Sequence, residues 1–249
     1  LSFHNLSNEL YSLSNISALP HLAAFSDYSG ERLASLRRSL TNAIEDAARS
    51  VTGAMKEIGK GPFAADRAGV QLQERFNGTL KPRYPVIMVP GIVSSGLEAW
   101  KSRECLSESY FRERVWGTTT MVRAILADPY CWMDHVALDP ETGLDPPGVK
   151  LRAATGLHSA DEFIVNFYIW SGVIRNLADV GYDENSLYMA SYDWRLGPQQ
   201  LERRDFYFSS LRDTVEQYVR RHGNPVLLIG HSMGCNVVSY FLQWVESEH

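Results

Sequence analysis

Apolar and polar residues follow two different periods along the chain, and the changes of period divide it into predicted elements. Over residues 31–58 the apolar positions recur every three or four residues, which predicts an amphipathic helix. Short, mainly apolar runs at residues 84–91, 187–192 and 225–230 predict buried strands. Helical spacing predicts further helices near residues 161–180, from about 200 to 222 and over 235–246.

This order of elements indicates the fold class. Strands separated by helical segments are typical of βαβ units, in which helices cover both faces of a parallel sheet. Residues 101–160 break the alternation, because turn-forming residues gather at 139–148 and little periodicity is visible. A long irregular stretch inside a compact domain is usually functional. We therefore predict an α/β domain over residues 81–249, with a cap or lid at about 101–160.

Residues 1–80 form a predicted N-terminal extension, whose main feature is the amphipathic helix at 31–58. Two interpretations of this helix stay open. It can pack on the surface of the domain, or it can lie on a membrane surface, because basic residues flank its apolar stripe. Acidic residues on the same helix dilute that positive charge.

Composition narrows the classes of function. With 45% hydrophobic and 21% charged residues, the chain resembles an ordinary globular protein with material for a core. A net charge of -5 with dispersed Lys and Arg argues against nucleic acid as a partner. The longest apolar runs are shorter than the roughly 18 residues needed to cross a bilayer. No signal peptide is recognisable, and the missing initiator Met suggests that residues precede Leu1.

The motif Gly-His-Ser-Met-Gly occupies residues 230–234, between a predicted strand and a predicted helix. This context is the one that the nucleophile elbow of α/β hydrolases requires. The sharp turn holds Ser232 in a strained conformation, and Gly230 and Gly234 remove side chains that would collide with neighbouring backbone. We predict Ser232 as a covalent nucleophile. The alternative is that Ser232 only caps the helix.

A serine nucleophile needs amide groups that stabilise the oxyanion. The amide of Met233 lies at the start of the predicted helix, where the macrodipole favours negative charge. The second donor is expected in the loop after an earlier strand, and there Gly91 permits a turn that leaves the Ile92 amide as the candidate. The Pro-Gly pair can also be a simple turn. His231 is interpreted as a packed elbow residue rather than the base.

Five ordered blocks give the chain a resemblance to a known family. They read VIMVPGIVSSGLEAW (86–100), RVWG (114–117), LDPETGLDPPGVKLR (138–152), SYDWR (191–195) and GHSMG (230–234). With these blocks the sequence resembles the lecithin:cholesterol acyltransferase family, and within it the phospholipid:diacylglycerol acyltransferase branch. Several blocks in one order are more specific than a single motif.

The resemblance implies an α/β-hydrolase fold and a serine-dependent lipid O-acyltransferase. The enzyme would take a fatty acyl group from a phospholipid, hold it on Ser232 and deliver it to diacylglycerol, forming triacylglycerol, or to a sterol. The resemblance also implies work at a membrane surface on the lumenal face of the endoplasmic reticulum. No cofactor or metal is expected, because acyl transfer from an ester needs none.

The same resemblance implies roles for individual residues. Ile92 and Met233 correspond to the two oxyanion donors, Cys105 and Cys131 to a lid disulfide, and Trp116 to a lid tryptophan that contacts lipid. A bridge between these cysteines would close a loop of about 25 residues, worth roughly 3 kcal/mol. The alternatives are two free buried thiols and a Trp116 packed in the core. The third cysteine, Cys235, is expected to be a packed thiol.

Asp193 and Arg195 stand two residues apart after a predicted strand. Side chains with this spacing in an extended chain point to the same side, so the two can pair. We interpret the pair as structural, although it lies near the predicted site.

The catalytic acid and base are not recognisable in the sequence. In α/β hydrolases they follow the nucleophile, whereas only Glu246, Glu248 and His249 are available after the elbow helix begins, and they lie on or just past it. The remaining histidines precede the elbow: His4, His21, His135, His158 and His222. We therefore expect a chain truncated after the elbow helix, unstable and inactive alone, with its acid and base after His249. A lipase or phospholipase that uses water, and a catalytically dead lipid-binding fragment, remain alternatives.

Overall fold

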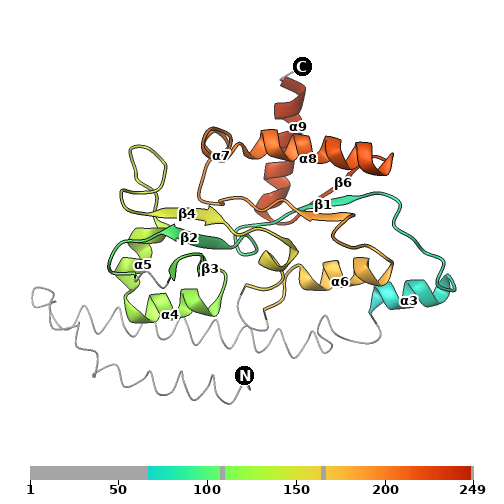
Figure 1. Ribbon diagram of the computed structural model, residues 1–249, viewed down its shortest axis with the longest axis horizontal. Helices are drawn as coiled ribbons and strands as arrows, with labels where there is room; N and C mark the ends of the chain where they lie inside the picture. Colours follow the sequence, from blue (N-terminus) through green and yellow to red (C-terminus); the bar gives the residue numbers. More distant parts are fainter. Residues whose placement is uncertain (1–66, 107–109, 164–166, 248–249) are drawn as a thin grey trace, which may run out of the picture. The chain divides into compact units, whose positions relative to one another are not determined.

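Two small sheets organise the part of the chain that the structure, a computed structural model, describes: residues 67–106, 110–163 and 167–247 (Figure 1). All of these residues belong to one unit, Lys60–His249. The predicted helix over 31–58 lies outside the described residues. Within them, no helix combines the length and the apolar character that a membrane span needs.

The first sheet is parallel, with strand order β5-β1-β6. Its central strand β1 (Val86–Val89) pairs with β5 (Leu187–Met189) on one side and with β6 (Leu227–Gly230) on the other. Every residue of β1 is buried, as expected for a continuous apolar run that helices cover on both faces. The three predicted strands are confirmed, each shorter than its apolar run.

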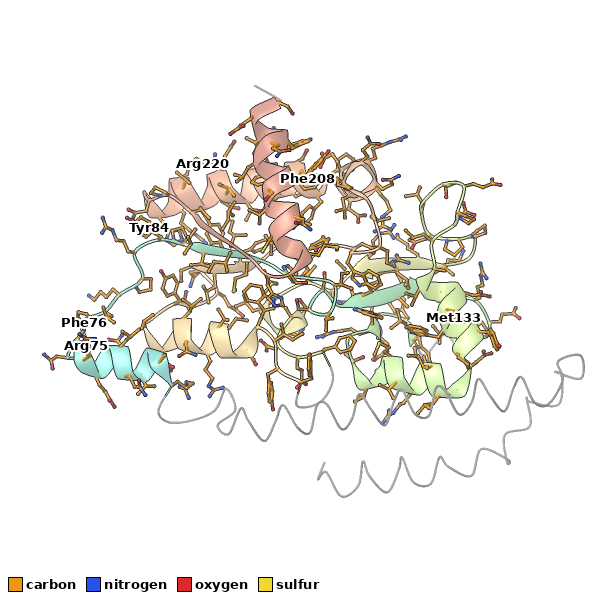
Figure 2. The ribbon with its side chains drawn as sticks, turned by 180° about the vertical axis from the view of Figure 1, so that it is seen from behind. Arg75, Phe76, Tyr84, Met133, Phe208 and Arg220 are labelled. Atoms are coloured by element: carbon orange, nitrogen blue, oxygen red, sulfur yellow. A yellow bond between two sulfur atoms is a disulfide. The ribbon has the colours of Figure 1, made fainter. Side chains whose placement is uncertain are left out.

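Helices cover both faces of this sheet. Ile87 and Val89 of β1 pack with α8 (Tyr207–His222) and α9 (Met233–Ser247), whereas Val86 and Met88 face α6 (Ser171–Asp179). Figure 1 shows α8 and α9 on one side of the strands and α6 on the other. Where α8 passes α9, the ring centroid of Phe208 lies 5.0 Å from that of Tyr240 (Figure 2). The described chain therefore has the predicted α/β class.

Two predicted helices differ from the structure. The helix expected from about 200 to 222 is two helices, α7 (Pro198–Asp205) and α8, because Phe206 adopts a left-handed φ of 52° between them. The Glu202 carboxylate accepts the amide of Phe208 at 2.9 Å and so satisfies a free N–H at the start of α8. The helix expected near 161–180 is shorter, because α6 begins at Ser171.

The second sheet is antiparallel, with order β3-β2-β4. We refer to the described residues from Leu97 to Ala153 as the cap module, which contains β2 (Leu97–Lys101), β3 (Arg114–Trp116), α4 (Thr119–Ala127), α5 (Pro129–Val136) and β4 (Lys150–Ala153). A short 3₁₀ turn, η4 (Leu157–Ser159), follows it. The prediction that residues 101–160 are irregular is wrong. The elements here are too short for periodicity to reveal them.

One helix of the structure lies within the predicted N-terminal extension, residues 1–80. This helix, α3 (Ala68–Arg75), packs against α6. Arg67, just before α3, forms an ion pair with Asp179 of α6 at 2.6 Å, and the Gly69 amide donates to Asn176 Oδ1 at 2.7 Å. Residues at the start of this segment therefore bind α6, more than 100 positions away in the chain. A local sequence pattern does not reveal such contacts.

Candidate active site

Ser232 occupies the turn between β6, which ends at Gly230, and α9, which begins at Met233. Its φ is +55°, in the left-handed region that residues other than glycine rarely adopt. The side chain is exposed. A non-glycine residue held in this region is strained and is a common feature of functional sites. The structure therefore has the strand, turn and helix that the motif predicts.

The elbow glycines allow the turn to pack closely against its neighbours. A Cβ atom on Gly234 would collide with the Val89 carbonyl oxygen and come within 2.6 Å of the Pro90 carbonyl oxygen. A Cβ atom on Gly230 would lie 2.8 Å from the Cα of Cys235. Both contacts are with backbone, which has little freedom to move away. The start of α9 can approach β1 only because these side chains are absent.

The loop after β1 lies directly against the serine. A Cβ atom on Gly91 would come within 2.7 Å of Ser232 Cβ and 3.1 Å of Ser232 Oγ. Two neighbouring apolar side chains of this loop are accessible, with exposed fractions of 37% for Ile92 and 40% for Val93. Ser232 thus lies beside a glycine, and two exposed apolar residues follow that glycine in the loop.

Two backbone amides near Ser232 match the expected oxyanion donors. Within the described residues, neither the Ile92 amide nor the Met233 amide donates a hydrogen bond to another protein group. Met233 is also the first residue of α9, where the helix dipole attracts negative charge. A pair of free amides beside a nucleophile can stabilise an oxyanion. Their catalytic role remains a prediction.

Trp116 lies over the same loop. Its indole N–H donates to the Ile92 carbonyl oxygen at 2.9 Å. Its ring centroid lies 4.7 Å from that of Trp194 and 6.3 Å from that of Trp132, and the side chain is half-buried. Trp116 therefore combines packing with a hydrogen bond to the loop after β1. The lipid contact expected of this residue remains a prediction.

Cys105 and Cys131 are joined by a disulfide bond. Beside it, His135 is fully buried, and its ring nitrogens contact the Arg103 amide at 3.0 Å and the Cys131 carbonyl oxygen at 2.6 Å. Cys131, His135 and the disulfide thus tie α5 to the segment after β2. The expectation that Cys235 is packed is wrong, because this residue of α9 is exposed.

The Asp193–Arg195 pair exists, with 2.6 Å between Arg195 Nη2 and Asp193 Oδ2, and belongs to a larger network. Arg204 also contacts Asp193 at 2.8 Å, and Arg195 reaches Asp145 in the cap module at 2.7 Å. Burial alone would raise the pKa of Asp193, but hydrogen bonds and charge from both arginines outweigh it and lower that pKa. The network connects the end of β5 with α7 and the cap module. Sequence spacing revealed only its first pair.

Histidines of the described chain serve other contacts. His222 Nε2 contacts the Asn185 carbonyl oxygen at 2.9 Å, and the His231 ring packs edge-on against Trp170. His135 is engaged at the disulfide. Among the described residues, no histidine forms a hydrogen bond with the Ser232 hydroxyl.

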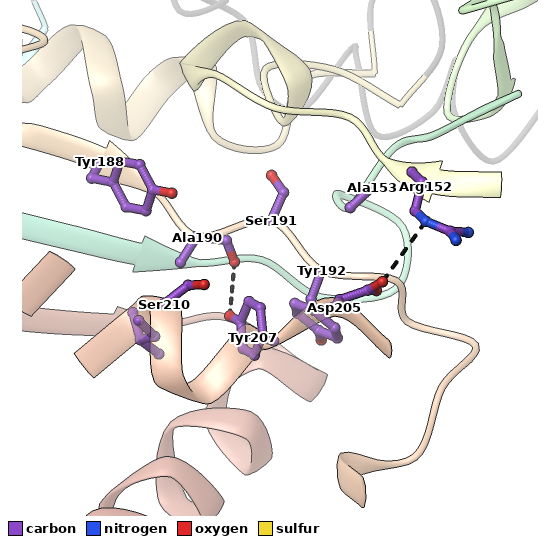
Figure 3. A pocket seen from close by; sticks show the side chains of 10 residues that line it. Arg152, Ala153, Tyr188, Ala190, Ser191, Tyr192, Asp205, Tyr207 and Ser210 are labelled. Carbon is purple, nitrogen blue, oxygen red and sulfur yellow. Dashed lines mark hydrogen bonds and ion pairs between the residues drawn. The ribbon is translucent and has the colours of Figure 1, made fainter. Parts of the chain in front are cut away.

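A cavity of about 310 Å³ lies apart from these residues. The ends of β4 and β5 and the start of α8 line it, and none of the site residues predicted from the sequence takes part (Figure 3). The Tyr207 hydroxyl donates to the Ala190 carbonyl oxygen at 2.9 Å, and Arg152 Nε faces Asp205 at 3.8 Å. The hydroxyl of Tyr192, a residue that also lines the cavity, has no partner in the described chain, and burial raises the pKa of that group.

Comparisons with known proteins relate this chain to acyltransferases. A sequence profile of the family described as lecithin:cholesterol acyltransferase matches residues 110–249. The chain is similar to a phospholipid:diacylglycerol acyltransferase of Schizosaccharomyces pombe, with 48% identity over 195 residues, which cover 75% of this chain and 31% of that protein. The protein of the same name from Saccharomyces cerevisiae is 47% identical over 183 residues, covering 72% of this chain and 27% of its own length.

A relative with another acceptor in its name is also similar. The phospholipid–sterol O-acyltransferase of Arabidopsis thaliana is 32% identical over 191 residues, which cover 73% of this chain and 30% of that protein. The chain therefore spans less than a third of the length of these relatives.

Proposed function

Because this chain belongs to the lecithin:cholesterol acyltransferase family, we propose that Ser232 is the nucleophile of a lipid O-acyltransferase with an α/β-hydrolase fold. The observation that carries the proposal is the geometry at Ser232: its φ is +55°, its side chain is exposed, and the loop that holds the Ile92 amide packs against it. A serine that only capped α9 would need neither this conformation nor the close approach of Gly91.

The chemical step balances without a cofactor. Ser232 Oγ attacks an ester carbonyl carbon of a phospholipid and gives its proton to a general base, while the amides of Ile92 and Met233 stabilise the oxyanion. The carbon–oxygen bond of the ester then breaks, and the lysophospholipid leaves with that proton. An acceptor hydroxyl next attacks the acyl carbon and loses its proton to the base. The bond between Ser232 Oγ and the acyl carbon breaks, and the base returns that proton to Oγ.

We assign the phospholipid as acyl donor and diacylglycerol as acceptor, so that the product is triacylglycerol. This choice is supported by the names of the two fungal relatives, and the sterol acceptor is kept because the plant relative is named for it. Exposed Ile92 and Val93 next to the serine suit an apolar substrate. The disulfide suits the oxidising lumen of the endoplasmic reticulum, at its membrane surface.

Product analysis on the full-length protein tests the proposal. With acyl-labelled phosphatidylcholine and added diacylglycerol in mixed vesicles, we expect labelled triacylglycerol, and Ser232→Ala should lower its formation about 10⁴-fold or more. Free fatty acid as the sole labelled product would instead support a lipase. Lipid binding without turnover in either protein would support the non-catalytic alternative.

A further inference from the structure

Trp170 stands directly before α6, and its indole contacts both halves of the candidate site. The ring N–H donates to Ser94 Oγ at 3.3 Å, and the ring packs edge-on against His231 with centroids 5.9 Å apart. The side chain is only 3% exposed. One rigid, buried ring therefore joins the loop after β1 to the first residue after β6.

Ser94 transmits this contact to the backbone beside the nucleophile. Its hydroxyl oxygen accepts the Gly91 amide at 3.0 Å and lies 3.5 Å from the Gly91 carbonyl oxygen. Because a trans peptide is planar, the Gly91 carbonyl and the Ile92 N–H point in opposite directions. With its carbonyl turned toward Ser94, this peptide directs the Ile92 N–H away from Ser94. The orientation of the expected oxyanion donor is thus set by one buried hydroxyl.

We propose that Trp170 is a positioning residue for acyl transfer, which holds the Gly91–Ile92 peptide in place through Ser94 and keeps it in register with the elbow through His231. This inference rests on the proposed function of Ser232. An oxyanion hole works because its donors are fixed before the charge develops. Rotation of the Gly91–Ile92 peptide would turn the donor away while leaving the fold and the serine intact.

The position of the ring indicates more than core packing. Trp170 shares its apolar cluster with Val86, Met88 and Met189, whose side chains contact the ring without needing its N–H. The indole N–H is the part that a phenylalanine lacks, and its partner is the Ser94 hydroxyl. Loss of the indole N–H should therefore lower the rate of catalysis, whereas loss of the aromatic ring should lower the stability of the fold.

Trp170→Phe in the full-length protein tests this separation. The measurements are the rate at which a fluorophosphonate probe labels Ser232, kcat and KM for acyl transfer, and the Tm. We expect labelling and kcat to fall about 10-fold with KM unchanged, because the donor is misplaced while substrate binding is not. Trp244→Phe, on the far part of α9, is the matched control and should keep the wild-type rate.

Ser94→Ala provides a second variant and a coupling test. If Trp170 acts through the Ser94 hydroxyl, Ser94→Ala alone should slow labelling about 10-fold, and Trp170→Phe should add nothing in that background. Equal labelling rates for Trp170→Phe and Trp244→Phe, or fully additive effects, would overturn the positioning role while leaving Ser232 as nucleophile. Absence of labelling in the wild-type protein would remove the proposed nucleophile and this inference together.

Discussion

The nucleophile elbow (residues 230–234) and the cap module are held in place by different kinds of interaction. In the elbow, backbone lies against backbone, and the Gly234 position admits no further atom beside the Val89 and Pro90 carbonyl groups. In the cap module, side chains distant in sequence hold the structure, through the Cys105–Cys131 bond and the Asp145–Arg195 ion pair. A substitution that adds an atom should therefore disrupt the elbow, whereas a substitution that removes one partner of a side-chain contact should disrupt the cap module.

The largest effect on stability should come from breaking the buried ion network. Asp193→Asn takes from Arg195 and Arg204 the more deeply buried of the two carboxylates that they share, which should lower the free energy of unfolding by about 3–5 kcal/mol. Glu216→Gln, which removes the partner of an exposed Arg220, should cost about 0.5 kcal/mol or less and is the control. Chemical denaturation measures both.

The pH dependence of stability provides a second test of Asp193. Because its pKa is lowered in the folded state, its contribution is present above the unfolded pKa of about 4 and is lost as pH falls through the lower folded value. The wild-type protein should therefore lose stability in acid more steeply than Asp193→Asn. Parallel pH profiles of the two proteins would show that the carboxylate gains nothing from its arginines.

A smaller loss should follow when the disulfide is removed. Replacing both Cys105 and Cys131 by Ser frees a loop with a sequence separation of 26 residues. The expected loss is about 3 kcal/mol in unfolding free energy. Since the elbow is held by its own backbone contacts, Ser232 labelling should stay within about twofold of wild type under folded conditions. Cys235→Ser, which changes an exposed thiol, is the matched control. A large loss of labelling in the double variant would show that the elbow and the cap module are not independent.

The smallest loss of stability, with a much larger loss of function, should come from adding one carbon atom to the elbow. Gly234→Ala should cost about 1–3 kcal/mol, because the start of α9 must move away from β1. The displaced serine should be labelled about 100-fold more slowly. Gly172→Ala places the same methyl group where no atom lies within 4 Å, and it should be neutral or slightly stabilising. If Gly234→Ala were labelled at the wild-type rate, the close approach of α9 to β1 would not be required for the reactivity of Ser232.

The elbow could be predicted from sequence because its requirements are local. A buried strand, two glycines and a helix surround Ser232 within one short segment, and each leaves a pattern in the residues nearby. The strands β1, β5 and β6 were equally visible as apolar runs. Ile92 could be named only because the fold class fixes which loop faces the serine.

The rest was hidden because it depends on contacts between distant segments. Ser94 lies in one of the five blocks, but no local pattern assigns it or Trp170 a role, since the two meet across 76 positions of the chain. Arg204, near the end of α7, donates to Asp193, which lies 11 positions earlier in the chain. The left-handed Phe206 that separates α7 from α8 also leaves no mark in the helical pattern. The short strands of the cap module have too few residues to show a period, so the sequence predicts an irregular stretch where the structure has ordered elements.

The tryptophan cluster over the oxyanion loop has a spectroscopic consequence. Three of the six tryptophans, Trp116, Trp132 and Trp194, gather here, with the rings of Trp116 and Trp194 only 4.7 Å apart. Indoles this close couple their excited states, so they should produce a strong signal in near-ultraviolet circular dichroism. Because Trp116 also holds the Ile92 carbonyl, a change in that loop alters the geometry of the coupled pair. The near-ultraviolet circular dichroism signal should therefore change when the loop after β1 changes its conformation.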